Sequence, residues 1–357
     1  MEAVFRRDFI KLACVSAVGV LGLRLVSTQG LNLLSAEGTE AEGTKVSELP
    51  VIWLQAGGCT GCSVSFLNTK SPTITNVLVD EVIPGHHVNL LFHPTVMAAS
   101  GEKALSMLDP KKDFALVAEG SFATKDEGVY CMVGEETALK RLTDLGKRAI
   151  AVIALGTCAA YGGIPAADPN PTGAKGVKKI FDEYHISTPV INVPGCPAHP
   201  DWFVGTIATI LASGLQAVEL DSQGRPLAFF EHRIHDKCPR RGYYDMGKFA
   251  KKLSDPYCLY QLGCKGPITH ADCPTRLWNG GTNWCIGAGH PCVGCVEPGF
   301  PDDTSPFFRK ISLMNDALKN DVTEWIGKGL GIAALTGVGA HLGTTAASGR
   351  FKKEEEE

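Results

Sequence analysis

The sequence lacks a surplus of positive charge. Its 34 Lys and Arg residues are outnumbered by 38 Asp and Glu residues, for a formal net charge of −4, which argues against nucleic acid as a partner. Internal repeats are also absent. Between Cys238 and Cys295 the chain lacks long apolar runs and is dense in Gly and Pro. Such a segment cannot bury enough apolar surface to offset the entropy of its ordering, so something other than a hydrophobic core must hold it.

Cysteine is abundant where apolar runs are missing. Seven of the thirteen cysteines fall between Cys238 and Cys295. Disulfides, zinc or iron–sulfur clusters are the three kinds of link that would hold such a segment. Cys14 lies near the N-terminus, and the other twelve cysteines could all pair, so parity alone does not exclude disulfides.

The N-terminus predicts export. The pair Arg6 and Arg7 is followed by Phe9 and Lys11, and an apolar run extends from Leu12 to Val26. This pattern predicts a twin-arginine signal peptide with its linker over residues 1–40. The run is too short and too rich in glycine to predict a membrane span. The twin-arginine route exports proteins already folded, often with a metal cofactor inserted, which favours clusters over disulfides.

The body of the chain alternates short apolar runs with helical patterns. The runs have the length of strands and are apolar throughout, as in parallel strands buried on both faces. They are Val51–Gln55, Val88–Phe92, Phe114–Ala118, Ala149–Leu155 and Val190–Val193. Helices are expected at Glu135–Lys147, Gly176–Tyr184 and Trp202–Ser213. The order predicts an α/β fold with a flavodoxin-like, doubly wound parallel sheet over residues 48–222.

Four cysteines follow three of these strands. Cys59 and Cys62 come after the first, Cys158 after the fourth and Cys196 after the fifth, each flanked by Gly or Pro. Since ligands gather at the carboxyl edge of such a sheet, the four thiolates are expected to converge on a [4Fe–4S] cluster. Alone, the Cys-x-x-Cys pair would instead suggest a thioredoxin-like redox motif. Cys131 lies off this edge and is expected to be a packed free thiol.

Motifs along nearly the whole chain resemble the small subunit of a [NiFe] hydrogenase. They include Cys-Thr-Gly-Cys-Ser at residues 59–63, Glu-Gly-Ser at 119–121, Gly-Thr-Cys at 156–158, Pro-Asn-Pro-Thr-Gly at 169–173 and Pro-Gly-Cys-Pro at 194–197. Others are Ile-His-Asp-Lys-Cys at 234–238, Cys-Leu-Tyr-Gln-Leu-Gly-Cys-Lys-Gly-Pro at 258–267 and Gly-His-Pro-Cys-Val-Gly-Cys at 289–295. The resemblance implies a hydrogenase subunit that relays electrons from a nickel–iron centre in a separate large subunit to an external acceptor, through three iron–sulfur clusters.

The resemblance also implies ligands. The proximal cluster would take Cys59, Cys62, Cys158 and Cys196, the set that the strand order also predicts. An irregular cluster domain over residues 223–310 would hold the other two. His235, Cys238, Cys258 and Cys264 would bind the distal [4Fe–4S] cluster, and Cys273, Cys292 and Cys295 the medial one. A neutral imidazole in place of a thiolate would raise the distal potential, which suits the exit end of a relay.

Cys285 departs from the commonest family pattern, which has Pro there and a medial [3Fe–4S] cluster. This cysteine lies seven residues before Cys292 and could supply a fourth sulfur, giving a medial [4Fe–4S] cluster; the alternative is a buried free thiol.

Glu119, at the end of the third strand, is a candidate for proton movement or cluster polarity beside the proximal site, or else only caps a turn. No catalytic residue is expected in this chain. Oxygen-tolerant relatives have an additional cysteine where this chain has Gly61, which predicts ordinary oxygen sensitivity.

A candidate membrane anchor lies at residues 320–349. Residues 329–347 carry no charged side chain apart from His341, and Arg350, Lys352 and Lys353 follow, although glycine and threonine weaken the apolar signal. The expected location is the periplasmic face of the cytoplasmic membrane, with a cytochrome b, a cytochrome c or a similar acceptor as partner.

Two alternatives for the function of the whole chain remain open: a cluster-bearing subunit of a quinone-reducing complex, and an exported zinc or disulfide module that only binds a partner.

Overall fold

The computed structural model describes residues 47–111 and 113–310, together with a few residues between 334 and 344. All of these belong to one compact unit, Val46–Glu357. The expected signal peptide and most of the expected anchor lie outside the described residues. No helix within the described part of the chain is long and apolar enough to cross a membrane.

Five parallel strands form the central sheet. They are β1 (Ser47–Gln55), β2 (His86–Phe92), β3 (Ala115–Glu119), β6 (Ala151–Leu155) and β7 (Val190–Val193). Their spatial order is β2-β1-β3-β6-β7, which is the flavodoxin-like order, with the direction of winding reversing between β1 and β3. The predicted fold class and all five predicted strands are thus confirmed, with ends that differ by up to four residues.

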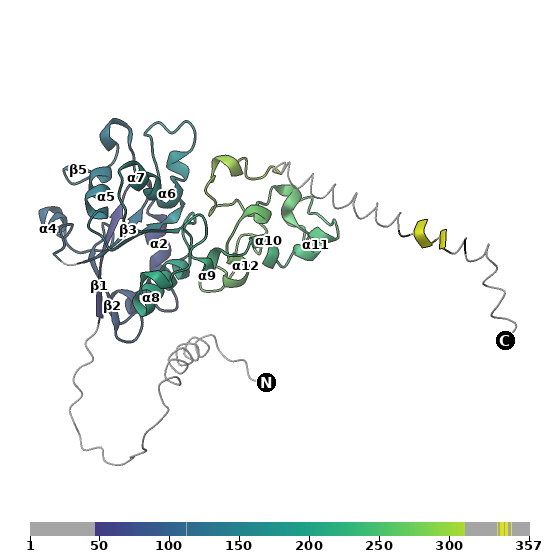
Figure 1. Ribbon diagram of the computed structural model, residues 1–357, viewed down its shortest axis with the longest axis horizontal. Coiled ribbons are helices and arrows are strands. Elements are labelled where there is room, and N and C mark those ends of the chain that lie inside the picture. The colour runs from purple at the N-terminus through teal and green to yellow at the C-terminus, as the bar shows by residue number, and fades with distance from the viewer. Residues whose placement is uncertain are drawn as a thin grey trace, which may run out of the picture. The chain divides into compact units, whose positions relative to one another are not determined.

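Helices cover both faces of the sheet (Figure 1). The helices of the sheet region are α2 (Gly61–Leu67), α3 (Ile74–Leu78), α4 (Gly101–Ser106), α5 (Ala138–Gly146), α6 (Gly156–Tyr161), α7 (Val177–Glu183) and α8 (Pro200–Ser213). Helices α2, α3 and α8 pack on one face, whereas α4, α5, α6 and α7 pack on the other. Side chains alternate accordingly, so that Trp53 of β1 faces α8 while its neighbours Ile52 and Leu54 face the second group.

The helix predicted over residues 135–147 is shorter in the structure, because its first residues belong to a small hairpin. Strand β4 (Met132–Val133) pairs with β5 (Glu136–Thr137), and α5 begins only after them. The helix begins there because the hydroxyl of Thr137 caps it, accepting the backbone N–H of Lys140 at 3.1 Å.

Beyond α8 the chain has little regular structure. It forms the short helices α9 (Leu227–Phe230), α10 (Ile234–Lys237), α11 (Arg241–Asp245) and α12 (Cys273–Arg276). Single 3-10 turns in this part are η3 (Leu215–Ala217), η4 (Leu259–Leu262), η5 (Gly266–Ile268) and η6 (Asp302–Thr304), and two more, η1 (Lys125–Gly128) and η2 (Ile164–Ala166), lie in the sheet region.

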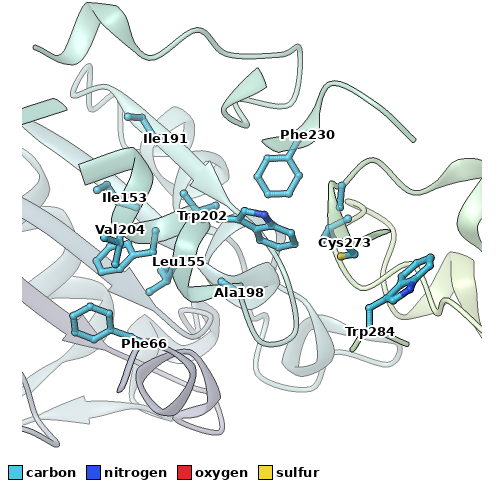
Figure 2. Close-up of a cluster of buried hydrophobic side chains, with 14 of the residues drawn as sticks. Phe66, Ile153, Leu155, Ile191, Ala198, Trp202, Val204, Phe230, Cys273 and Trp284 are labelled. Atoms are coloured by element: carbon cyan, nitrogen blue, oxygen red, sulfur yellow. The ribbon is translucent and has the colours of Figure 1, made fainter. Parts of the chain in front are cut away.

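The irregular segment shares a hydrophobic core with the sheet. Trp202 of α8 packs against Phe230, and the same buried cluster continues to Cys273 and Trp284 (Figure 2). Polar links reinforce this contact: Trp202 donates its indole N–H to Asp272 at 2.7 Å, and Arg276 forms an ion pair with Asp201 of α8 at 3.3 Å. The sheet region therefore supplies the apolar contacts that the cysteine-rich segment cannot supply by itself.

Candidate metal centres

The four predicted proximal cysteines come together at the carboxyl edge of the sheet. Cys59 and Cys62 follow β1, Cys158 lies in α6 directly after β6, and Cys196 follows β7. Burial raises the pKa of Cys158 to about 11, with further increases from Cys196 and Cys59. Burial likewise raises the pKa of Cys62 and of Cys196, and other thiols of the same group add to both shifts. The four sulfurs are thus close enough to interact electrostatically.

Glycines leave room for these sulfurs. A Cβ atom added to Gly156 would lie 2.4 Å from the sulfur of Cys62, and one added to Gly163 would lie 3.0 Å from that of Cys158. At Gly61 the added atom would lie 3.0 Å from the sulfur of Cys59. Gly156 and Gly163 also have positive φ angles, which favour glycine. Cys62 and Cys158 therefore lie against backbone that favours glycine, and the side chain of Cys59 lies close to Gly61.

Glu119 ends β3 beside the proximal cysteines and is almost fully buried. Its Oε1 atom accepts the backbone N–H groups of Cys62 and Ser63, each at 3.1 Å. Its Oε2 atom accepts the indole N–H of Trp53 at 2.8 Å and the hydroxyl of Ser63 at 2.5 Å. All four partners are donors, which suits a carboxylate. Glu119 therefore fixes the first turn of α2, which carries Cys62.

His93 extends this buried network. Its Nδ1 atom accepts the backbone N–H groups of Thr95 and Val96, so its proton is on Nε2, which lies 3.3 Å from the hydroxyl of Ser63. Burial lowers the pKa of His93 to about 4. A line of hydrogen bonds therefore runs from His93 through Ser63 to Glu119. His93 belongs to no spaced motif, and Ser63 was quoted only as the last residue of the Cys-Thr-Gly-Cys-Ser motif, so neither was expected to have a role; only the three-dimensional fold joins them.

The predicted distal ligands gather around α10 and η4. Burial raises the pKa of Cys264 to about 11, and its neighbours Cys258 and Cys238 raise it further. The N–H of Gly266 points at the sulfur of Cys264 at 3.4 Å. His235 is half-buried, and its ring packs against Tyr244 with centroids 4.5 Å apart. Burial and the nearby Arg241 lower its pKa, which favours the neutral imidazole that a metal ligand needs.

The predicted medial cysteines form a third group that includes Cys285. Burial raises the pKa of Cys273, and Cys295 and Cys285 raise it further. Burial raises the pKa of Cys295 to about 12, again with contributions from Cys285 and from Cys196. The pKa of the buried Cys292 is raised by burial and by Cys264 and Cys295. Cys285 thus lies within electrostatic reach of two of the three other medial cysteines.

The three groups are adjacent in the order proximal, medial, distal. Proximal Cys196 interacts with medial Cys295, and medial Cys292 interacts with distal Cys264. Hydrogen bonds agree with this order. The hydroxyl of Thr157, next to proximal Cys158, donates to the carbonyl of medial Cys295, and the N–H of Lys265, next to distal Cys264, donates to the carbonyl of medial Cys292 at 2.7 Å.

These residues fit iron–sulfur clusters better than a single ion. All twelve cysteines within the described residues are free thiols, and no three His, Cys, Asp or Glu residues among them are placed to hold one metal ion. A single tetrahedral zinc holds its sulfurs about 4 Å apart, whereas a cluster binds each thiolate to a different iron and spreads them further. Bound iron would also supply the positive charge that buried thiolates need.

Comparisons with known proteins agree with this arrangement. A family model described as the C-terminal part of the NiFe/NiFeSe hydrogenase small subunit matches residues 230–308. A second, for the 20 kDa subunit of NADH ubiquinone oxidoreductase, matches residues 59–210. The periplasmic [NiFeSe] hydrogenase small subunit of Desulfomicrobium baculatum is 43% identical over 323 residues, covering 85% of this chain and 98% of the relative. The chain belongs to the [NiFe]/[NiFeSe] hydrogenase small-subunit family.

Further similarities extend this result. The uptake hydrogenase small subunit of Azotobacter vinelandii is 35% identical and covers 99% of this chain and 94% of the relative. The solved structure of the [NiFeSe] hydrogenase from Desulfovibrio vulgaris Hildenborough has a TM-score of 0.70 and 46% identity, covering 74% of this chain and 99% of that one. The chain is therefore a subunit of a hydrogenase, as its motifs predicted.

Family membership decides between the alternatives left open by the sequence. The match to the ubiquinone oxidoreductase subunit ends at residue 210, before the second group of cysteines, and residues 230–308 match the hydrogenase family instead. A subunit of a quinone-reducing complex is therefore not supported. Membership in an enzyme family likewise argues against a module that only binds a partner. Cys131 is a half-buried free thiol whose pKa is raised by burial, as expected for a packed cysteine.

Proposed function

We propose that this chain is the electron-transfer subunit of a hydrogenase, relaying electrons between H2 oxidation at a nickel–iron centre in a large partner subunit and an external acceptor. The observation that supports this most directly is the unbroken sequence of sulfur groups, in which Cys196 adjoins Cys295 and Cys292 adjoins Cys264. Iron–sulfur clusters supply one-electron carriers at such sites.

The proposed ligands are those expected from the sequence. Cys59, Cys62, Cys158 and Cys196 would hold a proximal [4Fe–4S] cluster; His235, Cys238, Cys258 and Cys264 a distal one; and Cys273, Cys285, Cys292 and Cys295 a medial one. The electrostatic interactions of Cys285 with Cys273 and Cys295 support a four-iron medial cluster over a three-iron one.

The surrounding residues would hold and insulate the carriers. Cys273 and Cys292 are buried in the middle of the proposed relay, whereas Cys285 is exposed and half-buried His235 opens the distal site toward solvent. Glu119 would keep the amides of Cys62 and Ser63 oriented next to the proximal site, and proton movement through this residue remains a proposal.

Metal analysis tests this function. The purified complex should contain about 11 iron atoms with a three-iron medial cluster and about 12 with a four-iron one. Nickel should be present only when the large subunit is bound, because the sulfur groups of this chain are assigned to iron. Zinc in place of iron, or a complex without a nickel-bearing partner, would contradict the proposal. Selenium in that partner would distinguish a [NiFeSe] from a [NiFe] large subunit, since relatives of both kinds are similar to this chain.

We also propose export by the twin-arginine route and attachment to the periplasmic face of the membrane. The support is the Arg6-Arg7 pair and the weakly charged stretch from 329 to 347. Truncation after Asp321 should release the complex from membranes with its iron content unchanged, since every proposed ligand precedes Ser305. A full-length complex that is soluble without detergent would contradict the anchor.

A further inference from the structure

The distal site lies in a basic part of an acidic protein. Residues 231–258 contain seven Lys and Arg but four Asp and Glu, whereas the whole chain has a net charge of −4. This stretch carries His235, Cys238 and Cys258, three of the four proposed distal ligands. Electrons would therefore leave the chain through a surface whose charge is opposite to that of the protein as a whole.

The acidic groups of this stretch are already engaged. Asp236 forms ion pairs with Arg233 at 3.2 Å and Arg241 at 3.7 Å, and Asp245 pairs with Arg241 at 2.8 Å. The Oδ2 atom of Asp255 accepts the backbone N–H groups of Lys251 and Lys252. Glu231 lies 3.6 Å from the imidazole of His232.

The lysines, in contrast, point their charge outward. Lys237, Lys248, Lys251 and Lys252 are exposed, and within the described residues none of them forms an ion pair. Lys310 adds a further charge, with its Nζ atom 5.0 Å from the ring of Tyr260. We call these five residues the basic face.

The backbone holds the basic face next to the distal ligands. The N–H of Cys258 donates to the carbonyl of Lys248 at 3.3 Å, and the N–H of Ala250 donates to the carbonyl of Cys258 at 2.8 Å. Lys237 directly precedes Cys238. The positive charge is therefore fixed around the distal site rather than spread along a free loop.

Exposed apolar side chains lie among these lysines. Met246, Leu253 and Tyr257 are exposed by 59%, 44% and 40%, respectively. Aromatic residues and Met are enriched at protein–protein interfaces, where a partly charged rim surrounds an apolar centre. This combination suits a protein partner better than a small anion.

We propose that the basic face docks an electron-acceptor protein with an acidic surface around its own redox centre. The inference rests on the proposed relay function, because only the exit of electrons at His235 makes this face an acceptor site. Complementary charge would steer the two proteins together and orient the acceptor centre toward the distal site.

One acceptor in two charge states tests this proposal. A basic monohaem cytochrome c and the same cytochrome with succinylated lysines share one haem but differ in the sign of their surface charge. Each H2 oxidised by the complex yields two protons and two electrons, and each ferric haem takes one electron. At low salt the succinylated form should be reduced at least about tenfold faster, and the advantage should shrink as ionic strength rises and screening shortens.

A matched pair of variants isolates the basic face. Lys248, Lys251 and Lys252 are changed to Gln in one complex, and three exposed lysines on other elements, Lys103, Lys147 and Lys179, in the control. The first variant should lose most of the advantage of the succinylated cytochrome, whereas the control should keep it. Both should reduce a small uncharged quinone as fast as the wild type, because none of these lysines is a proposed cluster ligand.

The possible outcomes separate cleanly. Faster reduction of the basic cytochrome by the wild type, or equal effects of the two lysine variants, would overturn the proposal. Cosedimentation with phosphatidylglycerol vesicles that depends on the three lysines, with no effect on cytochrome reduction, would overturn it in favour of a lipid surface. If the wild type reduces neither cytochrome nor quinone with H2, the relay function itself fails, whatever the charge of the face.

Discussion

Trp202 and Asp272 join the two halves of the molecule by a hydrogen bond of 2.7 Å between residues 70 positions apart. Asp272 directly precedes the proposed medial ligand Cys273, so the bond connects a helix on the sheet to the middle of the proposed relay. His199, at the start of the same helix, donates from Nε2 to the carbonyl of Leu277 at 2.7 Å. Helix α8 is therefore the main support of the medial segment.

Replacing Trp202 with Phe should weaken this support. The variant loses a hydrogen bond to a carboxylate, worth about 2 kcal/mol, and leaves a small cavity beside Phe230. The thermal midpoint of the purified complex should fall, and iron should be lost at a lower temperature than in the wild type. Tyr184→Phe, at an exposed position, serves as the control and should leave both measurements unchanged. Equal behaviour of the two variants would show that the contact contributes nothing measurable.

Replacing Cys285 with Pro should convert the medial cluster from four irons to three. Removing the fourth sulfur leaves one corner of the cube without a protein ligand, so that iron is easily lost. The oxidised complex should then show a strong three-iron EPR signal and contain one iron fewer.

Two further variants keep this prediction testable. Cys285→Ala should give the same signal if proline disturbs the loop, and Cys131→Ala, which changes a thiol outside the three groups, should leave the spectrum unchanged. A strong three-iron signal in the wild type would refute the role of Cys285 as a ligand.

Replacing Glu119 with Gln should destabilise the proximal site. The carboxylate accepts four hydrogen bonds, and an amide must turn its own N–H donors toward at least one of them. A cost of about 1–3 kcal/mol is expected for the donor left unpaired. Thermal unfolding of the complex measures the cost, with the exposed Glu102→Gln variant as control. If Glu119→Gln unfolds at the same temperature as Glu102→Gln, the network has no structural importance.

His93 should make stability depend on pH. Its pKa is about 4 in the folded chain because it is buried, compared with 6.5 in an unfolded one. The unfolded chain therefore binds a proton between these values that the folded chain does not, and stability falls as the pH falls from 6.5 toward 4. Between pH 7 and pH 5 the loss from this group is about 2 kcal/mol.

Chemical denaturation of the complex at both pH values measures this loss. His93→Gln should show a smaller difference between pH 7 and pH 5 than the wild type. His232→Gln, which changes an exposed imidazole, should show the full difference. The assignment fails if His93→Gln and the wild type lose the same stability.

Replacing Arg6 and Arg7 together with Lys should keep the folded complex in the cytoplasm. Lysine preserves the charge but not the pair that the twin-arginine route recognises. Cell fractionation followed by an H2-dependent activity assay locates the complex. Unchanged export would show that residues 1–40 are not a twin-arginine signal.

The sequence predicted the sheet well because its signals are local. Each buried strand is an unbroken apolar run, as at Ala151–Leu155, and parallel order then requires Cys158 and Cys196 to share one edge with Cys59. The family resemblance added the distal and medial sets. Their adjacency in space, such as that of Cys292 and Cys264, could not be predicted from spacing, because irregular backbone carries no periodic pattern.

The buried network was not predictable for a related reason. His93 follows β2 and Glu119 ends β3, and nothing in either segment reveals that both meet Ser63. A single buried histidine gives no sequence pattern that distinguishes it from an exposed one. The small hairpin before α5 was missed because its strands are only two residues long and resemble the start of the helix.

The order of the sulfur groups in space differs from the order in which a ribosome makes them. The proximal set is complete once Cys196 is synthesised and the distal set once Cys264 is, but the medial set awaits Cys295. The middle link is thus the last for which all parts exist. A chain released shortly after Cys264 would contain every residue proposed for both end sites and yet lack all four of the cysteines proposed to connect them. The proposed relay would therefore be complete only once Cys295 has been synthesised.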